Sequence, residues 1–285
     1  MNIAISVEST CDLSKELIKE FDISVIPFLV ILGEKEIPDG EVKPQDLFDY
    51  VEKTNKLPHT SAINEFQYEE YFKGLLENHD YVIHFALSSK ISVTCANAMN
   101  AAKNYEGKVF VIDTLSLSTG ISLQAIYGRK LANAGKKPEE IVEAVTKRIP
   151  YDQTSFSLES VNYLYKGGRC SMLKMIGANV LRLKPDILML EGSMKPGQKR
   201  RGPMKKVCVE YAEEMLKEFP NYDPELVFIT YSSAPEDVVD AVRAVLKNKG
   251  FKRIEATNAG ATITTYCGPH CLGILYMNDG PHPVE

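Results

Sequence analysis

Hydroxyl side chains gather directly after a short apolar run in the first third of the chain. Residues 81–87 are almost wholly apolar, and an Ala-rich stretch occupies 95–102. Between them lie four hydroxyl side chains: Ser88, Ser89, Ser92 and Thr94. The pattern predicts a buried strand of a parallel sheet followed by a helix. Because a helix start carries unpaired N–H groups and a positive dipole end, this turn suits an anionic oxygen, although ordinary helix capping explains the same hydroxyls.

Other predicted strands end in hydroxyls as well, whereas the common catalytic motifs are missing. The strands expected at 1–7 and 109–114 and the loop 56–62 all contain or lead into Ser and Thr residues. The chain has no phosphate-binding loop, no Gly-rich dinucleotide motif, no zinc-protease helix and no serine nucleophile elbow. Its five histidines do not fall at metal-ligand spacings. This favours a binding protein over a catalyst, although a catalytic base can come from anywhere in space.

Strands alternate with helices along the chain, which predicts two α/β domains. Residues 1–150 are expected to form a doubly wound, mostly parallel sheet, and 151–285 a second α/β domain, with the ligand between them. In doubly wound folds, ligands lie outside the carboxyl ends of the strands. Four local expectations accompany this division: one strand over 23–32, a turn over 33–40, a basic turn-forming segment over 195–206, and a loose tail over 279–285.

Bulk composition narrows the class of protein. The net charge of −5 disfavours a non-specific nucleic-acid binder. No apolar run reaches membrane-spanning length, and the N-terminus lacks the layout of a signal peptide. The six cysteines are scattered without a C-x-x-C pair, so neither a zinc site nor a disulfide framework is indicated. A cytoplasmic protein without stable membrane insertion is expected.

Six short motifs occur in sequence order: Glu-Ser-Thr-Cys-Asp-Leu at 8–13, Pro-His-Thr-Ser at 58–61, the hydroxyl turn at 88–94, Lys-Gly-Gly-Arg at 166–169, Leu-x-x-Lys-Pro at 181–185, and Lys-Arg-Arg at 199–201. Together they resemble the signatures of the DegV family, bacterial fatty-acid-binding proteins that serve as the acyl-carrying subunit of fatty acid kinase. The resemblance covers nearly the whole chain. Four positions depart from the family pattern: Glu8 replaces Asp, Val93 replaces Gly, and in the family's His-x-Gly-Pro-Gly motif Tyr266 replaces the histidine and His270 replaces the second Gly.

The resemblance implies a binding site for the carboxylate of a long-chain fatty acid. Its contacts would be Thr60, Ser61 and Ser92, with Val93 and Thr94 at the helix start and either Tyr266 or His270 at the histidine position. A separate kinase subunit would phosphorylate this carboxylate, and the protein itself would bind neither ATP nor a metal and need no cofactor. Arg169, Lys199 and Arg201 would face the kinase, although a solvated loop or a structural ion pair explains them equally well.

The acyl chain is expected to supply most of the affinity. At about 0.8 kcal/mol per buried methylene, a chain with roughly fourteen of them gains on the order of 11 kcal/mol before ordering costs. A charge-assisted hydrogen bond contributes only about 1.5–3 kcal/mol. Four side chains are expected to line the apolar slot, and core filling remains an open alternative for the last three: Phe28, Met172, Met175 and Ile176.

Two other functions compete with lipid binding. One is a stand-alone transferase or hydrolase that acts on a small anionic substrate through His270 or Tyr266. The other is a nucleic-acid-binding regulator that uses the basic residues of 195–206, which the negative net charge disfavours.

Overall fold

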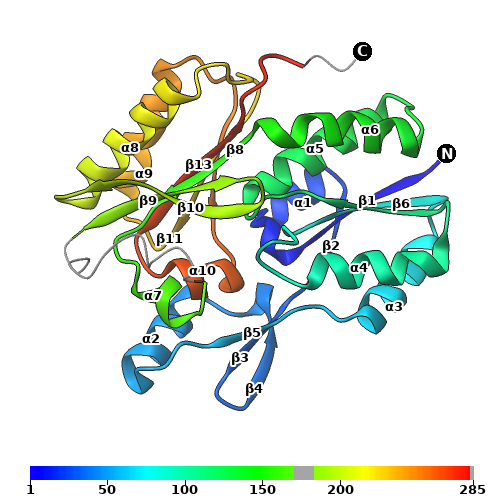
Figure 1. Cartoon of the computed structure of the whole chain (residues 1–285), viewed down its shortest axis with the longest axis horizontal. Coiled ribbons are helices and arrows are strands. Elements are labelled where there is room, and N and C mark those ends of the chain that lie inside the picture. Colours follow the sequence, from blue (N-terminus) through cyan, green and yellow to red (C-terminus); the bar gives the residue numbers. More distant parts are fainter. Residues whose placement is uncertain (170–182, 283–285) are drawn as a thin grey trace.

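The structure is a computed structural model that describes residues 1–169 and 183–282. A parallel sheet in the order β2-β1-β6-β7 forms the core of the N-terminal part, residues 1–150. Its strands are β1 (Ile3–Glu8), β2 (Ile23–Ile26), β6 (Tyr81–Ala86) and β7 (Val109–Asp113), and its helices are α1 (Lys15–Glu20), α3 (Glu65–Leu76), α4 (Thr94–Ala102), α5 (Thr119–Asn133) and α6 (Pro138–Arg148). Helices α3 and α4 cover one face and α5 and α6 the other, which confirms the doubly wound sheet (Figure 1).

A second, mixed sheet forms the C-terminal part, residues 151–282, in the order β10-β9-β8-β13-β11-β12. Its strands are β8 (Asp152–Ser157), β9 (Lys184–Leu190), β10 (Ser193–Arg200), β11 (Val227–Ser232), β12 (Ile254–Asn258) and β13 (Cys271–Met277). Helices α8 (Met204–Glu218) and α9 (Glu236–Asn248) pack on one face. Side chains alternate along β13, so Ile274 joins the core under these helices whereas Leu275 joins the core shared with β1.

A third, antiparallel sheet joins β4 (Lys35–Pro38), β3 (Leu29–Leu32) and β5 (His59–Ser61). Three helices lie near it: α2 (Pro44–Thr54), α7 (Asn162–Lys166) and α10 (Ala261–Cys267). Four short 3-10 turns occur along the described chain: η1 (Ser9–Cys11), η2 (Asp39–Glu41), η3 (Lys103–Tyr105) and η4 (Ile149–Tyr151). Although α10 comes from the end of the chain, it packs against α2 and β3. The division into two domains at residue 150 stays a prediction.

Three expected segments differ from the structure. The single strand expected over 23–32 is divided at Pro27 into β2 and β3, which belong to different sheets; proline has no N–H to continue a ladder. The turn expected over 33–40 contains β4, which pairs with β3 in a hairpin. The basic segment over 195–206 is not a loop, because β10 and the start of α8 occupy it. Strand β10 lies at the sheet edge and has a register shift after Pro196, and edges tolerate proline and glycine.

The tail after β13 begins as an anchored segment. The Arg148 guanidinium donates two hydrogen bonds of 2.7 Å to the carboxylate of Asp279, and Gly280 N donates to Asn221 O at 2.7 Å. A loose tail from residue 279 is therefore wrong for its first residues, and 283–285 lie outside the described residues. None of the helices in the described part of the chain has the length and apolarity to cross a bilayer.

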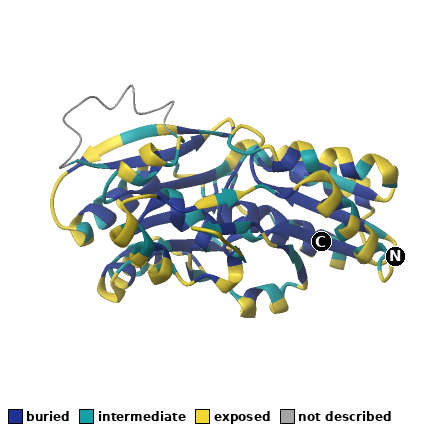
Figure 2. Ribbon diagram, turned by 90° about the horizontal axis from the view of Figure 1, so that it is seen from below, coloured by how far each residue is buried: buried dark blue, intermediate teal, exposed yellow. Residues whose placement is uncertain are grey.

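The start of α5 joins the two large sheets. The hydroxyls of Ser116 and Thr154 lie 3.0 Å apart, and those of Thr119 and Thr230 lie 2.7 Å apart. All four of these side chains are buried, whereas Figure 2 shows that exposed residues lie mainly on the outer helices. A Cβ atom at Gly120 would lie only 2.1 Å from Ser116 Oγ and 2.2 Å from Thr154 Oγ1. The close approach of α5 to β8 therefore depends on glycine at this position.

We predict that Gly120→Ala lowers the free energy of unfolding by about 1–3 kcal/mol, because the added methyl group overlaps buried hydroxyls. Gly74→Ala in α3 is the matched control, since a Cβ there meets nothing within 4 Å. Alanine has the higher helix propensity, so the control should be neutral or stabilising by up to about 1 kcal/mol. Urea unfolding of both variants tests this, and equal stabilities would contradict the prediction.

Candidate ligand-binding cavity

A cavity of about 900 Å³ lies between the N-terminal and C-terminal parts and is lined by both. This volume is in the range of small-molecule sites. Much of its wall is apolar, and the side chains come from segments far apart in the sequence: Phe28, Leu87, Ile91, Leu117, Phe156, Met194 and Leu275. Phe28, expected to line the apolar slot, is on this wall, and its contact with an acyl chain stays a prediction. Met172, Met175 and Ile176 lie outside the described residues.

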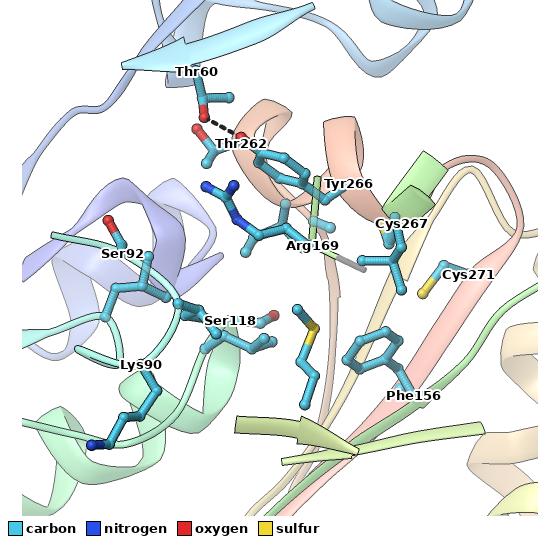
Figure 3. Close-up of a pocket in the computed structure, with 18 of the residues that line it drawn as sticks. Thr60, Lys90, Ser92, Ser118, Phe156, Arg169, Thr262, Tyr266, Cys267 and Cys271 are labelled. Carbon is cyan, nitrogen blue, oxygen red and sulfur yellow. Dashed lines mark hydrogen bonds between the residues drawn. The ribbon is translucent and has the colours of Figure 1, made fainter. Parts of the chain in front are cut away.

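Three polar side chains form one cluster on this wall, which we call the head cluster: Thr60, Arg169 and Tyr266 (Figure 3). The hydroxyls of Thr60 and Tyr266 lie 2.8 Å apart, and the guanidinium carbon of Arg169 lies 4.8 Å from the centre of the Tyr266 ring. Stacking of this kind is a favourable cation–π contact, and it leaves the planar edge of the guanidinium for a carboxylate. The cluster therefore combines a positive charge with hydroxyl donors.

The cluster is assembled by three short elements. Thr60 lies on β5, where it pairs with Val30 of β3. Arg169 follows α7, and its N–H donates to Leu164 O at 3.1 Å. Tyr266 lies near the end of α10. Gly167 lets α7 and α10 approach, since a Cβ there would lie 2.6 Å from the Tyr266 ring.

The hydroxyl turn after β6 contributes Ser92 and Val93 to the same cavity. Val93 has an ordinary right-handed backbone (φ −81°), so no glycine is required, and its side chain is 65% exposed. Ser92 Oγ accepts a hydrogen bond from Thr94 N at 3.2 Å, which is local capping of α4. Ser88 closes the turn against the C-terminal part by donating to Gly192 O at 2.7 Å. The hydroxyl turn therefore makes local capping contacts and also contributes to the cavity wall, and the binding of an anionic oxygen there stays a prediction.

Thr94 does not line the cavity among the described residues, because its side chain faces a buried network beneath the turn. Its hydroxyl lies 2.7 Å from Tyr68 Oη, which also donates to Glu8 Oε1 at 2.7 Å. The other oxygen of Glu8 accepts from Leu87 N at 2.8 Å. Glu8 therefore holds the turn from below, a supporting role that the sequence did not indicate.

Two further predicted contacts lie off the cavity. Ser61 is exposed, and its hydroxyl donates only to Ala62 O. His270 Nδ1 lies 2.6 Å from Glu159 Oε2, outside the described lining. Of the two candidates for the family's histidine position, Tyr266 is the one on the cavity wall. The part of the lining that the structure describes contains no histidine, aspartate or glutamate, so a stand-alone hydrolase would lack a carboxylate or imidazole base there.

The basic segment over 195–206 is not a free cationic surface. Arg200 is buried and donates to Asp186 at 2.9 Å and to Glu214 at 2.6 Å. Lys205 and Lys206 also pair with acids, Asp237 and Glu210. Lys199 and Arg201 are exposed, whereas Arg169, predicted beside them as a partner contact, lines the cavity. Neutralisation of three cations weakens the case for nucleic-acid binding.

The sequence analysis missed many cavity residues, and three of them are polar or charged side chains that bear on the site: Lys90, Lys195 and Thr262. The two lysines stood in motifs that had been noticed, the hydroxyl turn and the basic segment. Thr262 lies on α10, which is too short for its periodicity to reveal a helix. Figure 3 shows it beside Thr60 and Tyr266, and its buried hydroxyl has no hydrogen-bond partner within the described part of the chain. No group of three or more His, Cys, Asp or Glu side chains among the described residues could hold a metal ion.

A buried carboxyl group lies behind the wall at Ser118, whose hydroxyl donates to Asp12 Oδ2 at 2.5 Å. Burial raises the pKa of Asp12 to about 8, because it penalises the ionised form. Hydrogen bonds from Ser118 and Gly260 oppose this rise in pKa, and the charge of Asp39 adds to it. The carboxyl group is therefore largely protonated at neutral pH.

Comparison with known proteins agrees with the resemblance seen in the sequence. A family model described as the DegV family of uncharacterised proteins matches residues 2–279. A protein of Thermotoga maritima named a fatty acid-binding protein is 27% identical over 280 residues, covering 96% of each chain. The structure described as fatty acid binding of a DegV family protein from Thermus thermophilus is 26% identical, with a TM-score of 0.89 over 98% of this chain and 100% of that one. The Streptococcus pneumoniae Fatty Acid Kinase (Fak) B3 protein loaded with linoleic acid shares the fold, with a TM-score of 0.83 and 18% identity over 98% and 100% of the two chains.

The raised pKa of Asp12 predicts that stability declines with rising pH. Between about pH 4, where an unfolded Asp titrates, and about pH 8, the folded chain keeps a proton that the unfolded chain has released. The contribution of this group to the free energy of unfolding therefore falls as the pH rises through this window. Asp12→Asn should reduce the stability lost between about pH 5 and pH 8 by at least about 1.4 kcal/mol, the equivalent of one pKa unit.

Urea unfolding at a series of pH values measures this difference. Asp49→Asn is the matched control, because Asp49 is exposed on α2 and is hydrogen-bonded to Gln45. The control should follow the wild-type pH profile. A profile for Asp12→Asn that is parallel to the wild-type profile would refute the assignment.

Proposed function

The chain belongs to the DegV family, and from this membership and its cavity we propose that it binds one long-chain fatty acid between its N-terminal and C-terminal parts. The observation that carries the proposal is the junction of a long apolar wall with the head cluster in a single cavity. A fatty acid has the same two halves, a flexible apolar chain and one carboxylate. The relatives from Thermotoga maritima and Thermus thermophilus, described as fatty-acid-binding, support this ligand class.

The carboxylate would lie against Arg169, Thr60 and Tyr266, with Ser92 at the near rim. Arg169 offers N–H donors in a planar fork that matches a carboxylate. The Thr60 and Tyr266 hydroxyls are 2.8 Å apart, so one of them donates to the other. The hydroxyl that accepts in this bond keeps its own proton, which it can donate to the ligand. Thr262 supplies a further hydroxyl beside the cluster.

The acyl chain would run along Phe156, Met194 and Leu275, which line the same cavity. Figure 3 shows Phe156 on the side of the cavity away from Thr60. Met194 suits a flexible ligand, because its unbranched side chain adapts to chains of different shape. Gly273 lines the cavity where β13 pairs with β8, and the pairing leaves no room for a side chain, since a Cβ there would lie 2.6 Å from Ser155 O.

The finer part of the proposal is that the bound carboxylate is phosphorylated by a separate ATP-dependent kinase subunit, the chain itself being a non-catalytic carrier. The pneumococcal kinase-associated protein shares the fold at 18% identity, which supports a common architecture and no more. Support from this chain comes from the rim of the cavity: Ser89 and Lys90 are exposed, Ser92 is half-buried, and all three belong to the hydroxyl turn and line the cavity. These residues would face an incoming phosphoryl group.

We predict that protein purified from cells carries one acyl chain, released by denaturing extraction and identified by mass spectrometry. Arg169→Met should lower the affinity for an added fatty acid about 10- to 150-fold, because one charge-assisted contact of about 1.5–3 kcal/mol is lost. The affinity for the fatty alcohol of equal length should change less than about threefold, since most of its binding energy comes from the chain.

Arg243→Met on α9 is the control for this variant, because Arg243 does not line the cavity. It should leave both affinities unchanged. A protein that is purified empty, takes up no fatty acid and yet hydrolyses an ester unaided would replace the proposal with the stand-alone enzyme.

A second prediction separates presentation of the carboxylate to the kinase from retention of the fatty acid. Ser92→Ala should reduce acyl phosphate formation by a fatty acid kinase catalytic subunit about tenfold, while the affinity for the fatty acid changes less than about threefold. The product is trapped as a hydroxamate, and the bound lipid is quantified in parallel. Ser24→Ala on β2 is the control, outside the described lining.

If the loaded protein forms acyl phosphate with ATP alone, it is itself a kinase and the carrier role is wrong. If it is inert with every kinase subunit tried but holds the lipid, the kinase step fails and lipid binding stands.

A further inference from the structure

The first turn of α10 is held by two aspartates from the opposite end of the chain. Gly260 N donates to Asp12 Oδ1 at 2.7 Å. The next two N–H groups, those of Ala261 and Thr262, donate to Asp39 Oδ1 at 2.6 and 3.2 Å. The residue that precedes the helix is Gly260, which has no side chain to cap it. The unpaired N–H groups of this helix start are therefore satisfied from the N-terminal part.

The contact requires glycine at position 260. A Cβ atom there would lie 3.0 Å from Asp39 Oδ1 and 3.2 Å from Asp12 Oδ1. Both distances are tighter than ordinary packing, so a side chain would push the two carboxyl groups away from the helix start.

Asp39 is itself fixed in place by buried partners. It is 2% exposed, and its second oxygen accepts a hydrogen bond from Ser9 Oγ at 2.9 Å. Ser9 Oγ in turn accepts from Phe28 N at 3.0 Å, and Asp39 N donates to Phe28 O at 2.9 Å. The Glu-Ser-Thr-Cys-Asp-Leu motif at 8–13 thus supplies both Asp12 and the hydroxyl that orients Asp39. None of its residues lines the cavity in the described structure.

The other end of α10 carries Tyr266, so the helix connects the two aspartates to the head cluster. With seven residues, α10 is too short to be stable by itself. Its position is set by the contacts at its start, by its packing on α2 and β3, and by the Tyr266–Thr60 hydrogen bond. A shift at the start of so short a helix moves its end by a similar amount.

We propose that Asp39, together with Asp12, positions Tyr266 and Thr262 for the carboxylate of the ligand by holding α10 against the N-terminal part. The inference rests on the proposed function, because it assigns the clamp a role in recognition of the carboxylate. Asp39 touches no ligand in this arrangement; it acts through the helix.

The test compares two ligands that differ only at the head: a fatty acid and the methyl ester of the same acid. Asp39→Ala should weaken binding of the acid about tenfold, comparable to the loss of one hydrogen bond, and binding of the ester less than about twofold. Asp39→Asn keeps an acceptor oxygen without the charge and should restore part of the loss. In a Tyr266→Phe background, Asp39→Ala should add less than about twofold, since the two residues act as a unit.

Asp49→Ala, exposed on α2, is the control and should leave both affinities unchanged. Gly260→Ala provides a second route, because it displaces both aspartates without removing a charge. If Asp39→Ala does not fold, Gly260→Ala should still show the selective weakening: lower affinity for the acid and nearly unchanged affinity for the ester. Thermal unfolding identifies any variant that is merely destabilised.

Two results would overturn the inference: an equal loss for acid and ester, or a loss that adds in full to that of Tyr266→Phe. Either would make the clamp a general structural feature. Failure of the proposed function is distinguishable, because the wild-type protein would then bind neither ligand.

Discussion

A carboxylate drawn into a largely apolar cavity must be met by donors, because an unpaired buried charge costs several kcal/mol. In this chain the donors that could meet it lie on three short elements, β5, α7 and α10. Thr60 and Tyr266 are 206 positions apart in the sequence, yet their hydroxyls are within hydrogen-bond distance. The small sheet and the short helices thus have a role that the two large sheets cannot fill: they bring donors from both parts of the chain to one place.

The apolar wall and the head cluster differ in how precisely their side chains must be placed. Burial of a flexible chain is non-directional and scales with area, so it tolerates many arrangements of Met194, Phe156 and Leu275. Hydrogen bonds to a carboxylate are directional and fail with small displacements. It follows that supporting contacts should gather behind the head cluster. The structure has them there, since Asp12 and Asp39 hold α10, which carries Tyr266. The neighbouring hydroxyl turn is held in a similar way by Glu8.

Periodicity predicted the elements that are long and buried. The parallel strands β1, β6 and β7 and the helices α5 and α6 were expected because apolar runs and amphipathic repeats extend over many residues. The sequence did not reveal α10, which is short, or β10, whose Pro196 and Gly197 resemble a turn and are tolerated only because the strand lies at an edge. Thr60, Ser92 and Tyr266 were found through motifs. The placement of Ser61, Thr94 and His270 depends on which way each side chain turns, which no local pattern determines.

Tyr266 gives the head cluster a different charge from the one that a histidine at this position could give. An imidazole at this position could carry a proton and share the role of cation, whereas a phenol donates a hydrogen bond without a positive charge. Arg169 is then the cation of the cluster. The face of the Tyr266 ring stacks on its guanidinium, whose central carbon lies 4.8 Å from the ring centre. A ring that must both stack on Arg169 and reach Thr60 has little freedom to move. The position of α10 therefore matters more here than it would for a side chain with a single contact, and the start of this helix is hydrogen-bonded to two buried aspartates.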